Sequence, residues 1–182
     1  MAASDPTVQI IRSARRLRTA AARQVDGVIE VRVPAGLSAA EEARMVETLV
    51  ERIARRRAGG NIDLPARADL LARRYGLPRP ARIAWVDNQA QRWGSCTPAT
   101  GTIRLSLRLA PFPSWVLDYV IVHELAHLCV AGHGAAFWKL VSRYPLTERA
   151  RGFLIAKGLG DEDAPDRPGG VPDDGTGITG GP

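Results

Sequence analysis

Hydrophobic and polar residues alternate in an early segment of the chain. Ile29, Val31 and Val33 are separated by charged residues, which is the period of a half-buried β-strand. The Asp-Gly pair at 26–27 fits the type I′ turn of a two-residue hairpin. The pattern therefore predicts that a β-hairpin opens the domain.

A helical pattern follows over residues 39–58. Ser38 and Glu41 have the spacing of a capping box, in which two side chains satisfy backbone N–H groups at the start of a helix. Arginines occupy 55–57, ahead of Gly59, and basic side chains suit the negative end of a helix dipole. We favour that role for them over a nucleic-acid contact. The apolar stripe of this helix comprises Met45, Val46, Leu49, Val50 and Ile53.

The next segments predict a second helix and two strands. Asp63 is a candidate N-cap, and Gly76 before a proline is a helix stop, so a helix is expected between them. A strand is expected at about 81–86. After a turn signal at 98–101, leucines and isoleucine alternate with polar residues over 102–109, which predicts another half-buried strand.

Helical patterns fill the rest of the domain. Residues 114–130 are apolar nearly all round, which is typical of a helix buried in the core. Two further helices are expected near 135–144 and 147–158. Because strands and helices are grouped along the chain, the predicted fold class is α+β. The buried face of the first of these two helices comprises Phe137, Leu140, Val141 and Tyr144.

The length of 182 residues favours one domain, which we assign to residues 1–159. Residues 160–182 contain seven Gly, four Pro and six acids among 23 positions. Such a segment buries too little apolar surface to offset the entropy lost on ordering, so we expect a disordered acidic tail.

No apolar run approaches the ~18 residues of a membrane span, and the N-terminal residues lack a signal-peptide pattern. We therefore expect a cytoplasmic protein with no membrane partner. In that reducing compartment Cys96 and Cys129 should be free thiols, and Cys129 is expected to be a small core residue.

The charge of the chain is concentrated in the predicted domain. The whole chain has a net charge of +6, from 25 bases and 19 acids. Removing the one base and six acids of the tail leaves 24 bases and 13 acids, or +11, on residues 1–159. We interpret these bases, which are mostly arginines, as a solvated surface rather than a nucleic-acid interface.

All three histidines of the chain lie within eleven residues, beginning with the sequence His123-Glu-Leu-Ala-His127. On a helix, residues four apart lie about 6 Å apart along the axis and about 40° apart around it, so both imidazoles can reach one metal ion. Glu124 is one step round the helix, which places its carboxylate beside a metal-bound water, as a general base requires.

A third ligand requires the helix to end before His133. If the helix continued, His133 would lie roughly 9 Å beyond His127 along the axis and could not reach the same ion. Gly132 can adopt the left-handed conformation that turns the chain back. Three imidazoles and one water are typical of a catalytic zinc site, so we expect one Zn²⁺ per chain on His123, His127 and His133.

Several segments together resemble the YgjP-like metallopeptidase-domain family, whose relatives are the SprT-type zincins. They are the Arg-Trp-Gly-Ser-Cys run at 92–96, the Gly-Thr-Ile-Arg-Leu run at 101–105, residues 118–128 with the His-Glu-x-x-His motif, and the Phe-Trp pair at 137–138. The likeness extends over about residues 8–158.

This resemblance implies a zincin-like α+β fold, in which an N-terminal β-hairpin and a small antiparallel sheet pack on the buried helix that carries the active site. It also implies that His123, His127 and His133 bind zinc and that Glu124 is catalytic. For Cys96 the resemblance marks a position but no role, so a structural thiol and a site contact both stay open.

The preferred interpretation is a zinc metallopeptidase that acts on a peptide or protein substrate. The oxyanion would then be stabilised by Tyr144, Tyr119, Arg92 or backbone amides. An extended substrate would add to the edge of the 93–96 segment or of the strand at 102–109.

Two alternatives stay open. One is a zinc-dependent nucleotide phosphoanhydride hydrolase, with Arg92, Arg104 and Arg108 holding the phosphates. The other is a zinc-binding module associated with DNA, although a purely structural site needs no glutamate base. The sequence does not indicate an oligomeric state.

Overall fold

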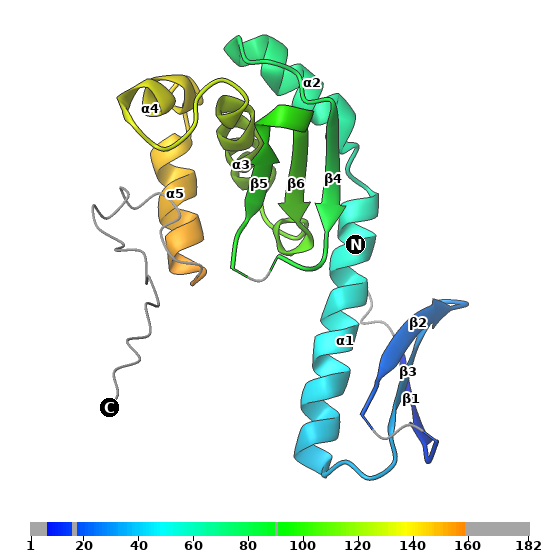
Figure 1. Cartoon of the computed structure of the whole chain (residues 1–182). Helices are drawn as coiled ribbons and strands as arrows, with labels where there is room; N and C mark the ends of the chain where they lie inside the picture. The colour runs from blue at the N-terminus through cyan, green and yellow to red at the C-terminus, as the bar shows by residue number, and fades with distance from the viewer. Residues whose placement is uncertain (1–6, 16–17, 90, 159–182) are drawn as a thin grey trace, which may run out of the picture.

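The computed structural model describes residues 7–15, 18–89 and 91–158. Two small sheets lie on either side of a long helix, and the remaining helices gather around the second sheet (Figure 1). None of the described helices is long and apolar enough to cross a membrane. The strands and helices, in chain order, are β1 (Val8–Ser13), β2 (Ala21–Val25), β3 (Val28–Pro34), α1 (Ala39–Gly60), α2 (Leu64–Tyr75), β4 (Arg82–Val86), β5 (Gly94–Thr97), β6 (Thr102–Ser106), α3 (Ser114–His127), α4 (Ala135–Val141) and α5 (Thr147–Ala156).

The predicted hairpin is confirmed, but it does not open the fold. β2 and β3 pair antiparallel around Asp26 and Gly27, which have φ values of 48° and 83°, as a type I′ turn requires. β1 precedes the hairpin and pairs parallel with β3, so the strand order is β1-β3-β2. The sequence pattern did not predict β1.

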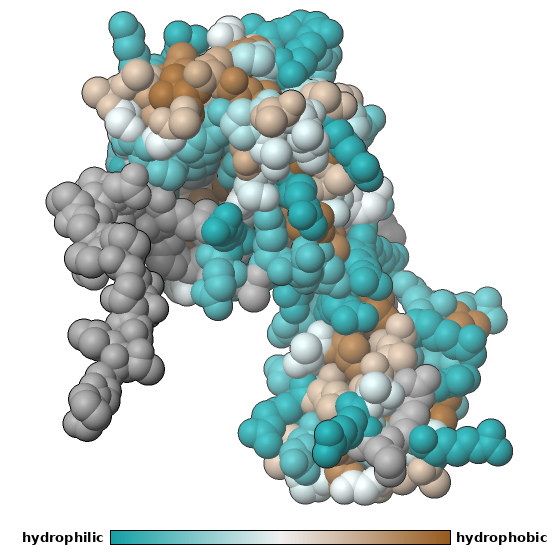
Figure 2. All heavy atoms as spheres, in the orientation of Figure 1, coloured by the Kyte–Doolittle hydropathy of each residue, from teal (hydrophilic) through white to brown (hydrophobic). Residues whose placement is uncertain are grey.

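The long helix α1 connects the two halves of the molecule. Its capping box is confirmed, because Glu41 N donates to Ser38 Oγ and Ser38 N donates to the Glu41 carboxylate. At its other end, Trp85 Nε1 of β4 donates to Gly59 O at 3.0 Å. A Cβ at Gly59 would lie 2.7 Å from Leu107 Cδ2, so the glycine lets α1 approach the second sheet closely. On the face shown in Figure 2, hydrophilic side chains cover the upper part of α1, and apolar side chains gather near α4.

The second sheet corrects the prediction of a small antiparallel sheet, because its strands are mixed. β6 is central, pairs parallel with β4 and pairs antiparallel with β5. A periodic sequence predicts that a strand exists but not its partner or direction. The strand expected at 102–109 also ends early, at Ser106, whose side chain accepts from Arg108 N and so caps a 3₁₀ turn over Leu107–Leu109.

The helix expected at 114–130 ends at His127. Three residues that were predicted to be helical therefore lie beyond its end, and Cys129 is exposed rather than a core residue. The two helices that follow are confirmed but shorter than predicted, because each ends two or three residues early.

Buried hydrophobic residues form two separate clusters. One lies between β3 and α1, where Ile29, Val31, Val33 and Leu49 are buried. The other joins α2, the second sheet and α3–α5, and α3 is its centre with ten buried residues. That residues 1–159 form one domain stays a prediction, and the predicted tail at 160–182 lies outside the described residues.

Candidate active site and metal centre

Three imidazoles converge on one point at the end of α3. The Nε2 atom of His127 lies 3.2 Å from Nε2 of His123 and 3.1 Å from Nε2 of His133, and the third separation is 3.3 Å. Zinc binds imidazole nitrogens at about 2.0–2.1 Å, so two ligands of a tetrahedral site lie about 3.3 Å apart. The arrangement fits a single zinc ion.

The turn after α3 brings the third histidine to the other two. Val130 N donates to Ala126 O at 3.0 Å, which closes the last turn of backbone bonds. Gly132 then adopts φ 73°, so the predicted left-handed conformation is confirmed. A residue with a Cβ would be strained there, and the chain would not return to the helix as easily.

The surroundings of two of the histidines, His127 and His123, suit metal binding. His127 Nδ1 lies 3.2 Å from Val130 O, and because a carbonyl can only accept, Nδ1 is the donor. In the neutral ring this leaves Nε2 as the nitrogen that can bind a metal. Burial, followed by the charges of His127, His133 and Arg151, lowers the pKa of His123 well below its usual value. Neutral imidazole is the form that binds a metal.

Glu124 lies under β5, next to the histidines but on another side of α3. It is 4% exposed, and Gly94 of β5 lies directly against it. A Cβ built on Gly94 would lie 2.8 Å from Glu124 Cδ and 2.9 Å from Glu124 Cγ, and it would meet Oε1 more closely still. The Glu124 carboxylate also affects the neighbouring Cys96. Burial, and in second place the negative charge of Glu124, raises the pKa of the Cys96 thiol to about 11.

All four predicted site residues line one open cavity of about 460 Å³. Arg92 also lines this cavity, whereas Arg104 and Arg108 do not. The cavity is therefore bounded by the end of α3, the turn after it, and β5 with the loop before it. The lining residues are Arg92, Gly94, Ser95, Cys96, Pro98, His123, Glu124, His127, Ala131 and His133.

A family model described as "YgjP-like, metallopeptidase domain" matches residues 13–154. The chain belongs to this family. Membership indicates a metallopeptidase and therefore a hydrolase, and it confirms the resemblance found in the sequence.

The YgjP-like domain is similar to two solved structures of archaeal metallopeptidase zymogens. The metallopeptidase zymogen abylysin of Pyrococcus abyssi matches with 20% identity and a TM-score of 0.46, over 50% of this chain and 91% of that one. The zymogen jannalysin of Methanocaldococcus jannaschii matches with 22% identity and the same TM-score, over 53% and 97%. No curated protein matches significantly.

Two motifs of the YgjP-like family gain a physical role from the geometry. The Phe137 ring stacks on His127 at 4.4 Å and lies 4.8 Å from the rings of His123 and His133, so it supports all three imidazoles. Gly94 gives the Glu124 carboxylate the room it occupies. Sequence reasoning placed Phe137 on the buried face of its helix and marked Gly94 by resemblance alone. It predicted neither contact, because each joins two separate elements of the fold.

The structure separates the candidates for oxyanion stabilisation. Tyr144 donates its hydroxyl to Trp115 O at 2.8 Å and lines a different cavity. Burial, followed by the charge of Asp118, raises the Tyr144 pKa to about 12. Tyr119 is buried and does not line the site cavity, so Arg92 is the one side chain of the three that does.

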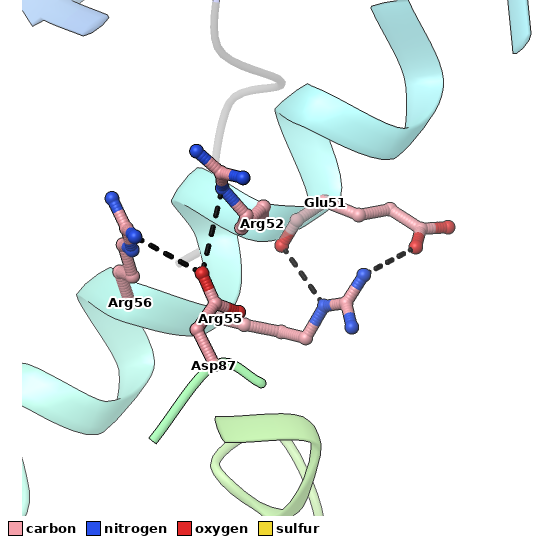
Figure 3. A network of polar contacts seen from close by, with 5 residues as sticks. All are labelled: Glu51, Arg52, Arg55, Arg56 and Asp87. Carbon is pink, nitrogen blue, oxygen red and sulfur yellow. Dashed lines mark hydrogen bonds and ion pairs between the residues drawn. The ribbon is translucent and has the colours of Figure 1, made fainter. Parts of the chain in front are cut away.

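The loop between β4 and β5, which carries Arg92, is tied to α1 (Figure 3). Asp87 Oδ2 lies 3.0 Å from Arg56 Nη2 and 3.5 Å from Arg52 Nε, while Arg55 pairs with Glu51 on the same helix. Two of the three arginines that we predicted to face the negative end of the α1 dipole, Arg55 and Arg56, therefore contact acids. Exposed pairs contribute about 0.2–1 kcal/mol each. The two pairs of Asp87 connect the start of the loop to α1.

Proposed function

We propose that the chain is a zinc metallopeptidase with His123, His127 and His133 as ligands of one Zn²⁺ and Glu124 as the general base. The observation that supports this most strongly is the convergence of three imidazole Nε2 atoms beside a buried carboxylate in one open cavity. Three protein ligands leave a fourth position for water or substrate, which distinguishes catalytic from structural zinc sites.

Zinc bound to these imidazoles would supply a water with a pKa near 7 and a Lewis acid for the substrate carbonyl. In the proposed reaction, the Glu124 carboxylate accepts a proton from the attacking water and then donates it to the leaving nitrogen. The Glu124 side chain is buried against Gly94 of β5, which limits the positions that the carboxylate can take. The hydrogen bond from His127 Nδ1 to Val130 O fixes the orientation of that imidazole.

A peptide substrate fits the edge that β5 presents. Ser106 N donates to Trp93 O, so position 93 bonds to β6. In an antiparallel strand, the backbone N–H and C=O groups of successive residues point alternately to one neighbour and to the other. Gly94 and Cys96 therefore direct their backbone groups to the opposite edge of β5. No described strand pairs with that edge. An extended peptide added there lies beside the histidines. β6 is central, so the edge earlier expected at 102–109 is already paired.

The two alternatives have less support than the peptidase. A phosphoanhydride hydrolase was expected to use Arg92, Arg104 and Arg108 together, yet only Arg92 lines the cavity. A DNA-associated module would not require the buried Glu124 beside its zinc ligands. A cytoplasmic location and a single bound zinc belong to the proposal as well.

Glu124→Gln tests the proposal directly. The variant keeps the size of the side chain but is not basic, so zinc content should stay at one per chain while peptide turnover falls by about 10²-fold or more. Glu47→Gln, on the exposed side of α1, is the matched control for loss of one carboxylate. Undiminished turnover would exclude Glu124 as the base, and loss of zinc would instead make it a metal ligand.

A further inference from the structure

Arg92 has a distinct position among the charged residues of the cavity. Of the described residues that line it, Arg92 is the only arginine or lysine, and Glu124 is the only acid. The side chain of Glu124 is buried against β5, whereas Arg92 is exposed. A substrate that enters the cavity therefore meets one fixed positive charge on its protein wall.

The Arg92 guanidinium has no ion pair or hydrogen bond with any residue in the described part of the chain. Other arginines near the second sheet differ: Arg67 makes two bonds to Asp118, and Arg56 pairs with Asp87. An incoming anion would not have to displace an internal carboxylate from Arg92. The planar guanidinium offers paired N–H donors that match the two oxygens of a carboxylate.

The place of Arg92 in the chain sets how far from the reacting bond it acts. It lies in the loop just before β5, two residues ahead of Gly94, which touches Glu124. Two residues of extended chain span about 7 Å. Arg92 is therefore within reach of a group about two or three residues from the scissile bond of a peptide on the β5 edge.

We propose that Arg92 is a specificity-determining residue, which binds a carboxylate of the peptide substrate near the scissile bond. The carboxylate belongs either to an acidic side chain or to the free C-terminus. This inference rests on the proposed peptidase function. A specificity role differs from oxyanion stabilisation, because removal of an oxyanion-stabilising residue would slow the cleavage of acidic and neutral substrates alike.

Pairs of peptides measure how well the enzyme discriminates between substrates with and without the carboxylate. Zinc-loaded wild type is given C-terminally amidated peptides that differ by one Glu or Gln near the cleavage site, and neutral peptides with a free or amidated C-terminus. The pair that wild type distinguishes identifies the source of the carboxylate. In Arg92→Gln the preference, as a ratio of kcat/KM values, should fall about five- to tenfold, and Arg92→Lys should restore part of it. Arg82→Gln, which removes the same charge from β4 outside this cavity, is the control and should keep the wild-type ratio.

A binding measurement separates this inference from the proposed function. Zinc-loaded Glu124→Gln protein, with and without Arg92→Gln, is titrated with the same peptides by calorimetry. Tighter binding of the acidic or free-carboxylate peptide that depends on Arg92 supports the inference even if wild type hydrolyses nothing, in which case only the peptidase proposal fails. Equal binding of both members of every pair, or a kcat/KM ratio unchanged in Arg92→Gln, overturns it.

Discussion

Gly94→Ala should impair catalysis by displacing the Glu124 carboxylate. Gly94 is not among the glycines with positive φ, so alanine fits the backbone and the conflict is purely one of space. The new Cβ would lie 2.8 Å from Glu124 Cδ, whereas unstrained carbon contacts begin at about 3.5 Å. One of the two groups must therefore move by about 0.7 Å.

Both groups are held firmly, so the displacement has a cost. Glu124 belongs to a helix buried on nearly all sides, and β5 is fixed by its pairing with β6. Overpacking of this kind costs about 1–3 kcal/mol, offset by up to about 1 kcal/mol because alanine restricts the unfolded chain. A shift approaching 1 Å in a catalytic group can lower turnover by about 10²-fold.

The assay compares kcat, zinc content and Tm of Gly94→Ala with those of Gly152→Ala. A Cβ at Gly152 meets nothing within 4 Å, so this control adds the same methyl group without a contact. We expect kcat to fall by about 10²-fold in Gly94→Ala, Tm to fall by a few degrees, and zinc to be retained. A wild-type kcat in Gly94→Ala would refute the reasoning, because the position of Glu124 would then not limit turnover.

Two further predictions concern the metal ligands and the cysteines. His133→Ala should lose most of its bound zinc and unfold at lower temperature, since binding at such a site contributes to folding; stoichiometric zinc after extensive dialysis would contradict the ligand assignment. Iodoacetamide should alkylate the exposed Cys129 well before Cys96 at pH 8, because the reactive form is the thiolate and the pKa of Cys96 is raised to about 11. The alkylation of Cys96 should therefore accelerate about tenfold per pH unit up to that pKa. Equal alkylation rates of the two cysteines, measured by mass spectrometry, would contradict this prediction.

Local sequence signals predicted the helices well and the sheets only in part. Ser38 with Glu41, and Asp63 with Gly76, marked helix ends because capping depends on residues a few positions apart. Strand pairing depends on contacts between distant segments, so β1 and the mixed direction of the second sheet were missed. Alternation alone also predicted too long a strand at 102–109. The strand ends at Ser106, whose side chain accepts a hydrogen bond from Arg108 N at the start of a turn.

The candidate site was predictable to the extent that helical spacing determines it. The period of a helix placed His123, His127 and Glu124, and one glycine sufficed to predict that His133 returns to them. The cavity walls were not predictable in the same way. Arg92, Tyr119 and Tyr144 were equal candidates in sequence, and only the tertiary structure shows which of them lines the cavity.

The position of α3 explains why distant motifs accompany the His-Glu-x-x-His sequence. Successive helical residues are about 100° apart, so His123 and Glu124 point to different neighbours. Phe137 of α4 contacts the histidines, whereas Gly94 of β5 contacts the glutamate. The metal ligands and the base are thus supported by separate elements on separate sides of one buried helix. A change on the β5 side can displace the base while the three imidazoles keep their arrangement, which is why zinc content and turnover should respond independently to substitutions at Gly94.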